Sequence, residues 1–127
     1  MNLNNIFAKN EILGASMVGA QFRNNVINHN IANVDVPGFR RGVVEFENLL
    51  LREIETAERN DRRANFNAIS PELHISHHVL PHRNDGNNVD IELEMVALYQ
   101  NSTRFEVMSS SLINNYNRLN VALNSNI

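Results

Sequence analysis

The chain has 127 residues, the size of one domain, and it is too short for two independent hydrophobic cores. Its net charge of −3 argues against a generic nucleic-acid binder, which normally carries a basic stripe. The absence of Cys excludes disulfides, thiolate metal sites and Cys nucleophiles. No apolar run approaches the roughly 18 residues of a transmembrane helix, and the N-terminal residues do not resemble a cleavable secretion signal.

The first predicted element is a helix over residues 10–33, with Asn10 as its N-cap. Six residues of this helix follow the 4-3 spacing of a heptad seam, with one polar position that can fix register. They are Leu13, Met17, Ala20, Asn24, Ile27 and Ile31. Pro37 and Gly38 cannot continue a helix, and their order predicts a type II turn.

The middle of the chain predicts mixed, mostly irregular structure. Residues 39–46 read as extended, and a short amphipathic helix follows and runs to about residue 63. Two acid–base pairs spaced i,i+4 support that helix; they are Glu55 with Arg59 and Glu58 with Arg62. Residues 64–88 read as loop, with one short strand near Leu73, Ile75 and Val79.

The strongest signal is a helix from residue 89 to about residue 123, with Asp90 as its N-cap. At 1.5 Å per residue it would be about 50 Å long. Its apolar residues keep unbroken 4-3 spacing when small Ser102 and Ser109 are included. The apolar members of this second seam are Ile91, Met95, Leu98, Phe105, Leu112, Tyr116, Leu119 and Leu123.

The predicted fold is therefore mostly α. Two long terminal helices with heptad seams form an antiparallel, coiled-coil-like pair, joined by an extended and loop middle with one short helix. The chain divides into an N-terminal helix and turn (1–38), a middle region (39–88) and a C-terminal helix (89–127). Two helices alone bury little surface, so their unsatisfied faces indicate self-assembly or packing against other chains.

Candidate chemistry is sparse. His74, His77, His78 and His82 form the only cluster that resembles a metal site, but two prolines flank it and no helix presents the ligands. No glycine-rich phosphate loop and no nucleophile constellation are visible. The sequence predicts a protein that is not an enzyme, with no cofactor, metal, nucleic acid or small-molecule substrate.

Two sequence motifs carry a family resemblance. NIANVDVPGFRR, after a heptad helix, resembles the signature of bacterial flagellar rod, hook and related axial proteins, although Val36 stands where Thr is usual. The short length and the stretch RNDGNNVDIE, followed by Glu94-Met95-Val96, resemble the FlgB family of proximal rod proteins. The motif residues at the turn are Asn30, Ile31, Ala32, Asn33, Asp35, Pro37, Gly38 and Phe39.

The resemblance implies a structural subunit of the proximal rod of the flagellar basal body, in the periplasm. It would help connect the inner-membrane ring to the distal rod and transmit torque. Its partners would be other copies of itself, other rod and basal-body proteins, and the flagellar type III export apparatus, which requires no cleavable signal. Two other functions stay open on the residues alone: a small helical adaptor or secretion-chaperone-like binding module, and a His-dependent metalloenzyme.

Overall fold

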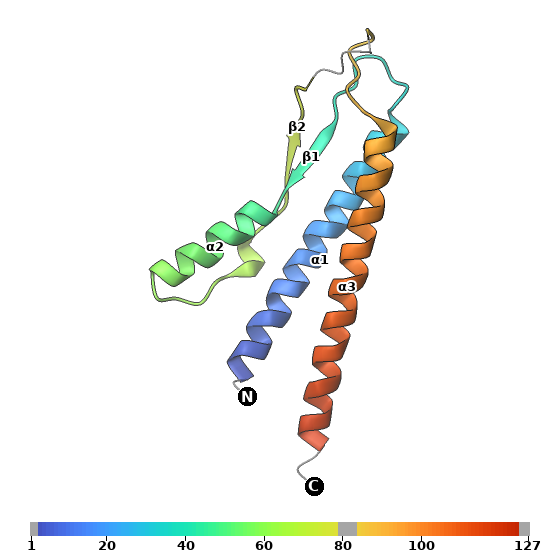
Figure 1. The fold of residues 1–127 in the computed structure, drawn as a ribbon. Helices are drawn as coiled ribbons and strands as arrows, with labels where there is room; N and C mark the ends of the chain where they lie inside the picture. Colours follow the sequence, from blue (N-terminus) through green and yellow to red (C-terminus); the bar gives the residue numbers. More distant parts are fainter. Residues whose placement is uncertain (1–2, 79–83, 125–127) are drawn as a thin grey trace.

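The computed structural model describes residues 3–78 and 84–124. Its two longest elements are helix α1 (Leu3–Ala32) and helix α3 (Ile91–Asn124), which run antiparallel beside each other (Figure 1). This arrangement confirms the predicted mostly α fold with two long terminal helices. None of the helices in the described ranges combines the length and the apolar character that crossing a membrane requires.

Helix α1 begins earlier than the sequence indicated. It includes residue 3, so Asn10 lies inside the helix and the prediction that it caps the N-terminus is wrong. The Asn10 side chain has another use, because its Oδ1 accepts a hydrogen bond from Asn115 Nδ2 of α3 at 2.9 Å. A packed neighbouring helix can stabilise the first turns of a helix despite weak local propensity.

The turn after α1 has the predicted type II character. Gly38 has a φ of +74°, a left-handed conformation that suits glycine. The N–H of Phe39 donates to the carbonyl of Val36 at 3.2 Å, which closes the turn. The chain is thereby redirected from the end of α1 into the strand that follows.

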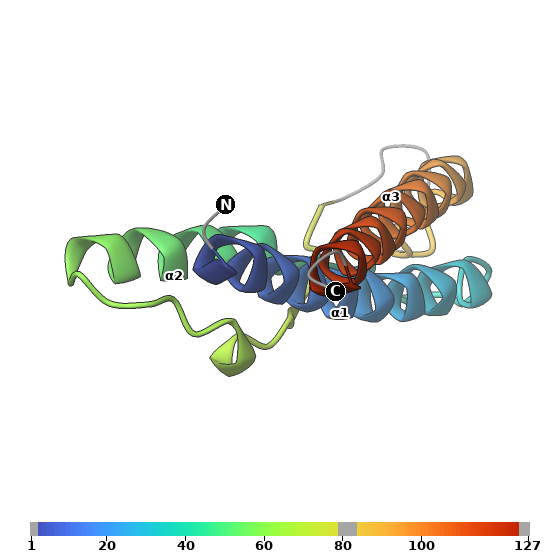
Figure 2. The same ribbon diagram turned by 90° about the horizontal axis from the view of Figure 1, so that it is seen from below.

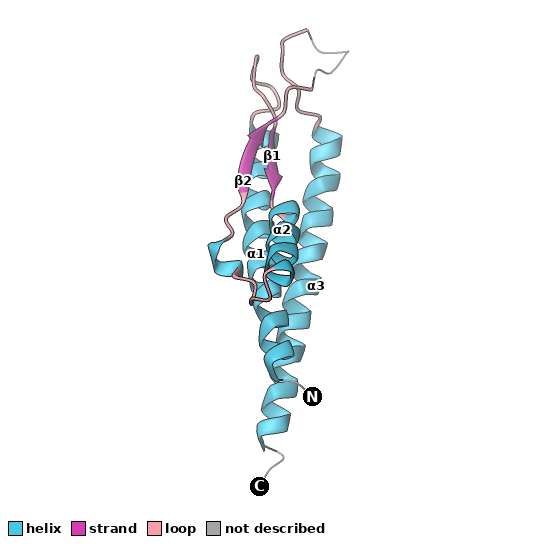
Figure 3. Ribbon diagram, turned by 90° about the vertical axis from the view of Figure 1, so that its left-hand side faces the viewer, coloured by secondary structure: helices cyan, strands magenta, loops and turns pink. Residues whose placement is uncertain are grey.

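Strand β1 (Gly42–Glu45) and strand β2 (Glu72–Ile75) form a two-stranded antiparallel sheet. Gly42 lies opposite Ile75, and Glu45 lies opposite Glu72. Residues 72–75 match the predicted short strand, whereas Val79, which the sequence also placed near it, falls outside the described residues. The sheet lies along the upper part of α1, with β1 as the strand that contacts the helix (Figures 1 and 3).

Helix α2 (Glu47–Arg59) and the 3-10 turn η1 (Phe66–Ala68) form an arm that projects sideways from the helix pair (Figure 2). The prediction that this helix reaches residue 63 is wrong. Asp61 adopts a left-handed φ of 48°, and the N–H groups of Asp61 and Arg62 bond back to the carbonyls of Glu58 and Ala57. This Schellman-type pattern ends the helix.

The predicted pair of Glu58 with Arg62 is consequently replaced. Arg62 lies beyond the helix end and binds the carboxylate of Glu53, with N–O distances of 2.7 and 3.2 Å. The same carboxylate accepts the backbone N–H of Asn65 at 2.7 Å. Glu53 therefore holds the segment that returns from α2 toward η1.

The buried core is small, and its apolar side chains come from α1, β1, α2, η1 and the residues just before α2 and α3. Its buried apolar side chains are Ala20, Ile27, Val44, Phe46, Ala57, Phe66 and Val89. Five polar side chains are also buried, namely Asn30, Asn87, Asn88, Glu94 and Asn101. Polar groups thus make up an unusual part of the interior, and each needs hydrogen-bond partners.

Candidate assembly surface and its polar network

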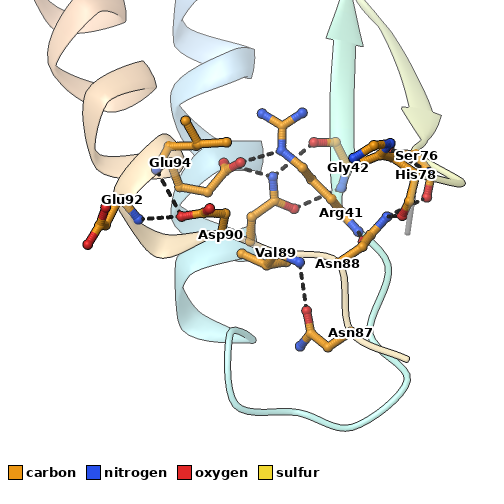
Figure 4. A network of polar contacts seen from close by, with 12 residues as sticks. Arg41, Gly42, Ser76, His78, Asn87, Asn88, Val89, Asp90, Glu92 and Glu94 are labelled. Atoms are coloured by element: carbon orange, nitrogen blue, oxygen red, sulfur yellow. Dashed lines mark hydrogen bonds and ion pairs between the residues drawn. The ribbon is translucent and has the colours of Figure 1, made fainter. Parts of the chain in front are cut away.

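The two motifs that carry the family resemblance meet at one end of the helix pair (Figure 4). Asn30, near the end of α1, donates from Nδ2 to the carbonyl of Gly42 at 2.9 Å and to Glu94 of α3 at 3.0 Å. Its Oδ1 accepts the N–H of Gly42 at 2.8 Å. One buried side chain therefore joins α1, β1 and α3.

Glu94 is fully buried and forms the charged centre of this network. Besides Asn30, it binds the guanidinium Nε of Arg41, whose side chain is one-third exposed. A buried carboxylate requires such a charge partner together with hydrogen bonds. Asp90 caps the same helix as predicted, because its Oδ1 accepts the N–H groups of Glu92 and Leu93 at 3.0 and 3.3 Å.

Two adjacent asparagines tie the loop before α3 to the rest of the network. Asn87 donates to the carbonyls of Asn33, Val34 and Val36 at 2.8 to 3.0 Å. These backbone carbonyls, which follow the end of α1, thereby have hydrogen-bond partners. Asn88 Oδ1 accepts the N–H of Arg41. Its Nδ2 donates to the carbonyls of Ser76 and His78 at 2.9 and 2.7 Å (Figure 4).

The other residues of the turn motif lie around this network. Ile31, Asn33 and Phe39 are half-buried, and Ala32, Asp35, Pro37 and Gly38 are exposed. The Phe39 ring contacts His29, with centroids 5.4 Å apart, and the N–H of Gly38 donates to the carbonyl of Asp85 at 2.9 Å. The motif therefore fixes the direction in which the chain leaves the helix pair.

One face of α3 points toward α1. Glu94, Asn101 and Asn115 on this face bond to Asn30, the carbonyl of Ala20 and Asn10 of α1. Residues at i, i+3 and i+4 share a helix face, so the half-buried apolar seam residues at matching intervals lie on it too. We call this face the inner row: Glu94, Leu98, Asn101, Phe105, Met108, Leu112, Asn115 and Leu119.

The remaining apolar seam residues of α3 stay uncovered. Their exposed fractions run from 46% to 73%, although they are large apolar or aromatic side chains. We call them the outer flank: Ile91, Met95, Tyr116 and Leu123. The second seam is thus split between α1 of the same chain and a surface that no described part of this chain covers.

The seam of α1 faces inward more completely. Ala20 and Ile27 are buried, and Leu13, Met17, Asn24 and Ile31 are half-buried. The contacts between α1 and α3 are the most extensive between any two elements. This seam therefore serves the fold of the single chain, with partly exposed edges left for neighbours.

The sequence did not identify the joint between α1 and α2. Phe46 is 2% exposed and packs against Gly19. Arg23 donates to Glu47 beside it. Partial burial has the largest single effect and raises the pKa of Glu47. The hydrogen bonds from Arg23 and from the backbone, together with the charges of Arg23 and Arg104, outweigh it, so the pKa of this carboxyl is lowered overall. Only Gly19 itself carried a signal, as a glycine inside a helical pattern.

The sequence also gave no sign of the roles of Glu94, Asn87, Asn88 and Asn101. Their roles depend on hydrogen-bond partners that are distant in the chain. The histidine cluster remains dispersed where it is described: His74 contacts the carboxylates of Glu45 and Glu72 at 3.3 and 3.7 Å. His82 lies outside the described residues. Within the described ranges, His, Asp and Glu side chains nowhere gather in a group of three that could hold a metal ion.

Comparison with known proteins gives a consistent result. No protein-family model matches the chain. The flagellar basal body rod protein FlgB of Borreliella burgdorferi is 35% identical, over 80% of this chain and 84% of that protein. The FlgB proteins of Bacillus subtilis (30% identity, 82% and 84% covered) and Borrelia hermsii (34%, 80% and 84%) are also similar. At this identity and coverage, the chain belongs to the FlgB family of flagellar basal body rod proteins.

Proposed function

We propose that the chain is a structural subunit of the proximal rod of the flagellar basal body and that it joins its neighbours through the outer flank of α3. The observation that carries this proposal is the exposure of Ile91, Met95, Tyr116 and Leu123 beside an inner row that already contacts α1. Full burial of one large apolar side chain contributes about 1.5–3 kcal/mol. Neighbouring rod proteins would supply that burial.

The division of the chain supports distinct roles for its parts. Segments 1–38 and 89–127 hold the helix pair that would build the rod, with copies of this chain and other basal-body proteins as partners. Segment 39–88 holds the sheet, which lies along α1, and the arm, which projects away from the pair and would face outward or a neighbour (Figure 1). Interlocked apolar flanks would resist shear and so transmit torque along a periplasmic rod.

The proposal also accounts for export. A helix pair with a small core and uncovered apolar flanks is only marginally stable before assembly. Such a chain remains easy to unfold for a type III export apparatus, which uses no cleavable signal, and it becomes ordered when neighbours bury its flanks. The curated relatives carry rod-protein names and so do not favour the adaptor or chaperone alternative.

A double substitution on the outer flank tests this function. Met95→Asp with Tyr116→Asp places charges on side chains that are 52% and 54% exposed, so the fold of the free chain should survive. In a strain that lacks the native gene, we expect the variant to be produced but to give no motility and no rods in purified basal bodies. Buried unpaired charges would prevent neighbours from packing.

The matched control is Leu51→Asp, at an exposed leucine of α2 that belongs to neither seam. This variant should retain rods and motility, and circular dichroism of each purified chain should show the helicity of the unmodified protein. Normal rod assembly by the Met95 and Tyr116 variant would show that the outer flank is not an assembly surface.

A further inference from the structure

The sheet has two edges, and its hydrogen-bond pattern shows which groups face each of them. The N–H of Ser76 donates to the carbonyl of Arg41 at 2.8 Å, so these residues form a bonded pair. Bonded and non-bonded pairs alternate along antiparallel strands. In the strand register, Val43 therefore bonds to His74. The N–H and C=O groups of Gly42 and Val44 point away from β2, toward the outer edge of β1.

The outer edge of β1 is closed by side chains of α1. Asn30 both donates to and accepts from the backbone of Gly42, as the peptide group of another strand would. Arg23 donates to the carbonyl of Val44 at 3.5 Å. A strand edge protected in this way cannot accept a further strand.

The outer edge of β2 is open. By the same alternation, the N–H and C=O groups of Leu73 and Ile75 point away from β1, and no group of the described residues bonds to them there. Both side chains are about half exposed. Figures 1 and 3 show β2 on the side of β1 that is turned away from α1 and α3.

An apolar groove lies directly beside this open edge. It has a volume of about 350 Å³ and is bounded by Leu73 and Ile75 above, by Val26 of α1 and by Phe39 of the turn. A strand added to β2 would place alternate side chains over this groove. Its occupant must therefore be extended and must carry apolar residues at every second position.

We propose that a second copy of this chain supplies that strand through its own β2, so that two copies pair edge to edge about a two-fold axis at His74. Leu73 then lies opposite Ile75 of the partner subunit, and the reciprocal pair forms by symmetry. The outward groups of both residues are bonded, and four apolar side chains meet over two grooves that lie side by side on the same face of the sheet. The Glu-Leu-His-Ile strand is self-complementary in this register.

The charged face of the sheet is compatible with this pairing. His74 lies opposite the partner's His74, and each ring already has carboxylates of its own chain, Glu45 and Glu72, at 3.3 and 3.7 Å. A two-fold contact closes on itself and cannot propagate into a rod. The two copies therefore pair before they join the rod. This pairing shields the open edge of β2 from aggregation, and incorporation into the rod separates the two strands.

A cysteine cross-link tests the pairing, since the chain has no cysteine of its own. In the proposed ladder the two His74 residues form a non-bonded pair with Cα atoms about 4.5 Å apart, within the range that a disulfide needs. The matched control is Val43→Cys, on the same face but one strand further from the axis, where the Cα atoms would be about 14 Å apart. Under mild oxidation, His74→Cys should form covalent dimers at least about tenfold faster than Val43→Cys.

Two further changes separate specific pairing from collision. Adding Ile75→Pro to His74→Cys removes an outward N–H together with the Ile75 side chain over the groove, and adding Leu73→Lys replaces an apolar side chain by a charged one without altering the backbone. Each should abolish the tenfold excess while circular dichroism shows unchanged helicity. Equal rates for His74→Cys and Val43→Cys, or an excess that survives both additions, would overturn the proposal. Rod assembly plays no part in this measurement, so its outcome is independent of the proposed function.

Discussion

At the scale of single residues, asparagine amides replace missing backbone partners in this protein. Asn30 meets both polar groups of Gly42, and Asn88 bridges the N–H of Arg41 and the carbonyl of Ser76. An amide side chain carries one acceptor oxygen and two N–H donors, so it can bond like a peptide group. The network holds helices and strands together where apolar contacts are few.

Replacing Asn30 should therefore be severe. Asn30→Ala leaves the backbone of Gly42 and the buried Glu94 without three hydrogen bonds. We expect a loss of about 3 kcal/mol in the free energy of unfolding, measured by urea denaturation followed by circular dichroism. The control is Asn28→Ala on the same helix, where the exposed side chain bonds only to Asn24, and it should change stability by less than about 0.5 kcal/mol. Equal losses in the two variants would contradict this role for Asn30.

The sequence predicted such residues only in part. The chain contains 23 asparagines; Asn30 and Asn88 lie in the two family motifs, but nothing in their local sequence indicates which groups they bond to. The cap at Asp90 and the turn at Gly38 were predictable because the residues that form them lie within three positions of each other. Asn30 and Glu94 bond to each other across 64 positions of the chain, and hydrophobic spacing carries no information about such pairs.

At the scale of elements, spacing predicted the two long helices but not how the face of α3 is divided. The predicted seam holds Leu98 and Leu112, which are on the inner row, together with Ile91 and Met95, which are exposed. The inner row instead includes Glu94 and Asn101, two polar positions that an apolar pattern excludes. The helix ends differed for a similar reason, because packing and the left-handed Asp61 override local propensity.

Alanine substitutions at two glycines of α1 should have opposite effects on stability. A Cβ at Gly19 would lie 2.7 Å from Cγ of the buried Phe46, whereas a Cβ at Gly14 meets nothing within 4 Å. Gly19→Ala should therefore destabilise the chain by about 1–3 kcal/mol through overpacking. Gly14→Ala should stabilise it by up to about 1 kcal/mol because alanine favours the helix. Thermal melts of both variants would check this, and a stabilising Gly19→Ala would contradict the close packing of α1 against Phe46.

At the scale of the whole molecule, the helix pair and the arm are held by different forces. The pair shares the buried network around Glu94 and the most extensive contacts in the fold. The arm has its own buried side chains, Phe46, Ala57 and Phe66, and in addition three ion pairs near the surface: Arg23 with Glu47, Arg62 with Glu53, and Arg63 with Glu11 at 2.8 Å. Exposed ion pairs are individually weak and respond to salt and pH. The arm should therefore loosen under conditions that the helix pair tolerates.

Acid provides the test of this difference. The hydrogen bonds from Arg62 lower the pKa of Glu53 to about 2 in the folded chain, from an ordinary 4.5. A lowered pKa means that the folded state favours the charged carboxylate. The stabilisation is therefore complete above pH 4.5 and is lost as the pH falls toward 2. The protection factors of the α2 amides, which correct for the slower intrinsic exchange in acid, should fall across this range before those of α1 and α3 do. Glu53→Gln should give fast exchange of the last turn of α2 already at neutral pH, with no further step attributable to this group in acid. Simultaneous loss of protection in α2 and α3 would show instead that arm and pair unfold as one unit.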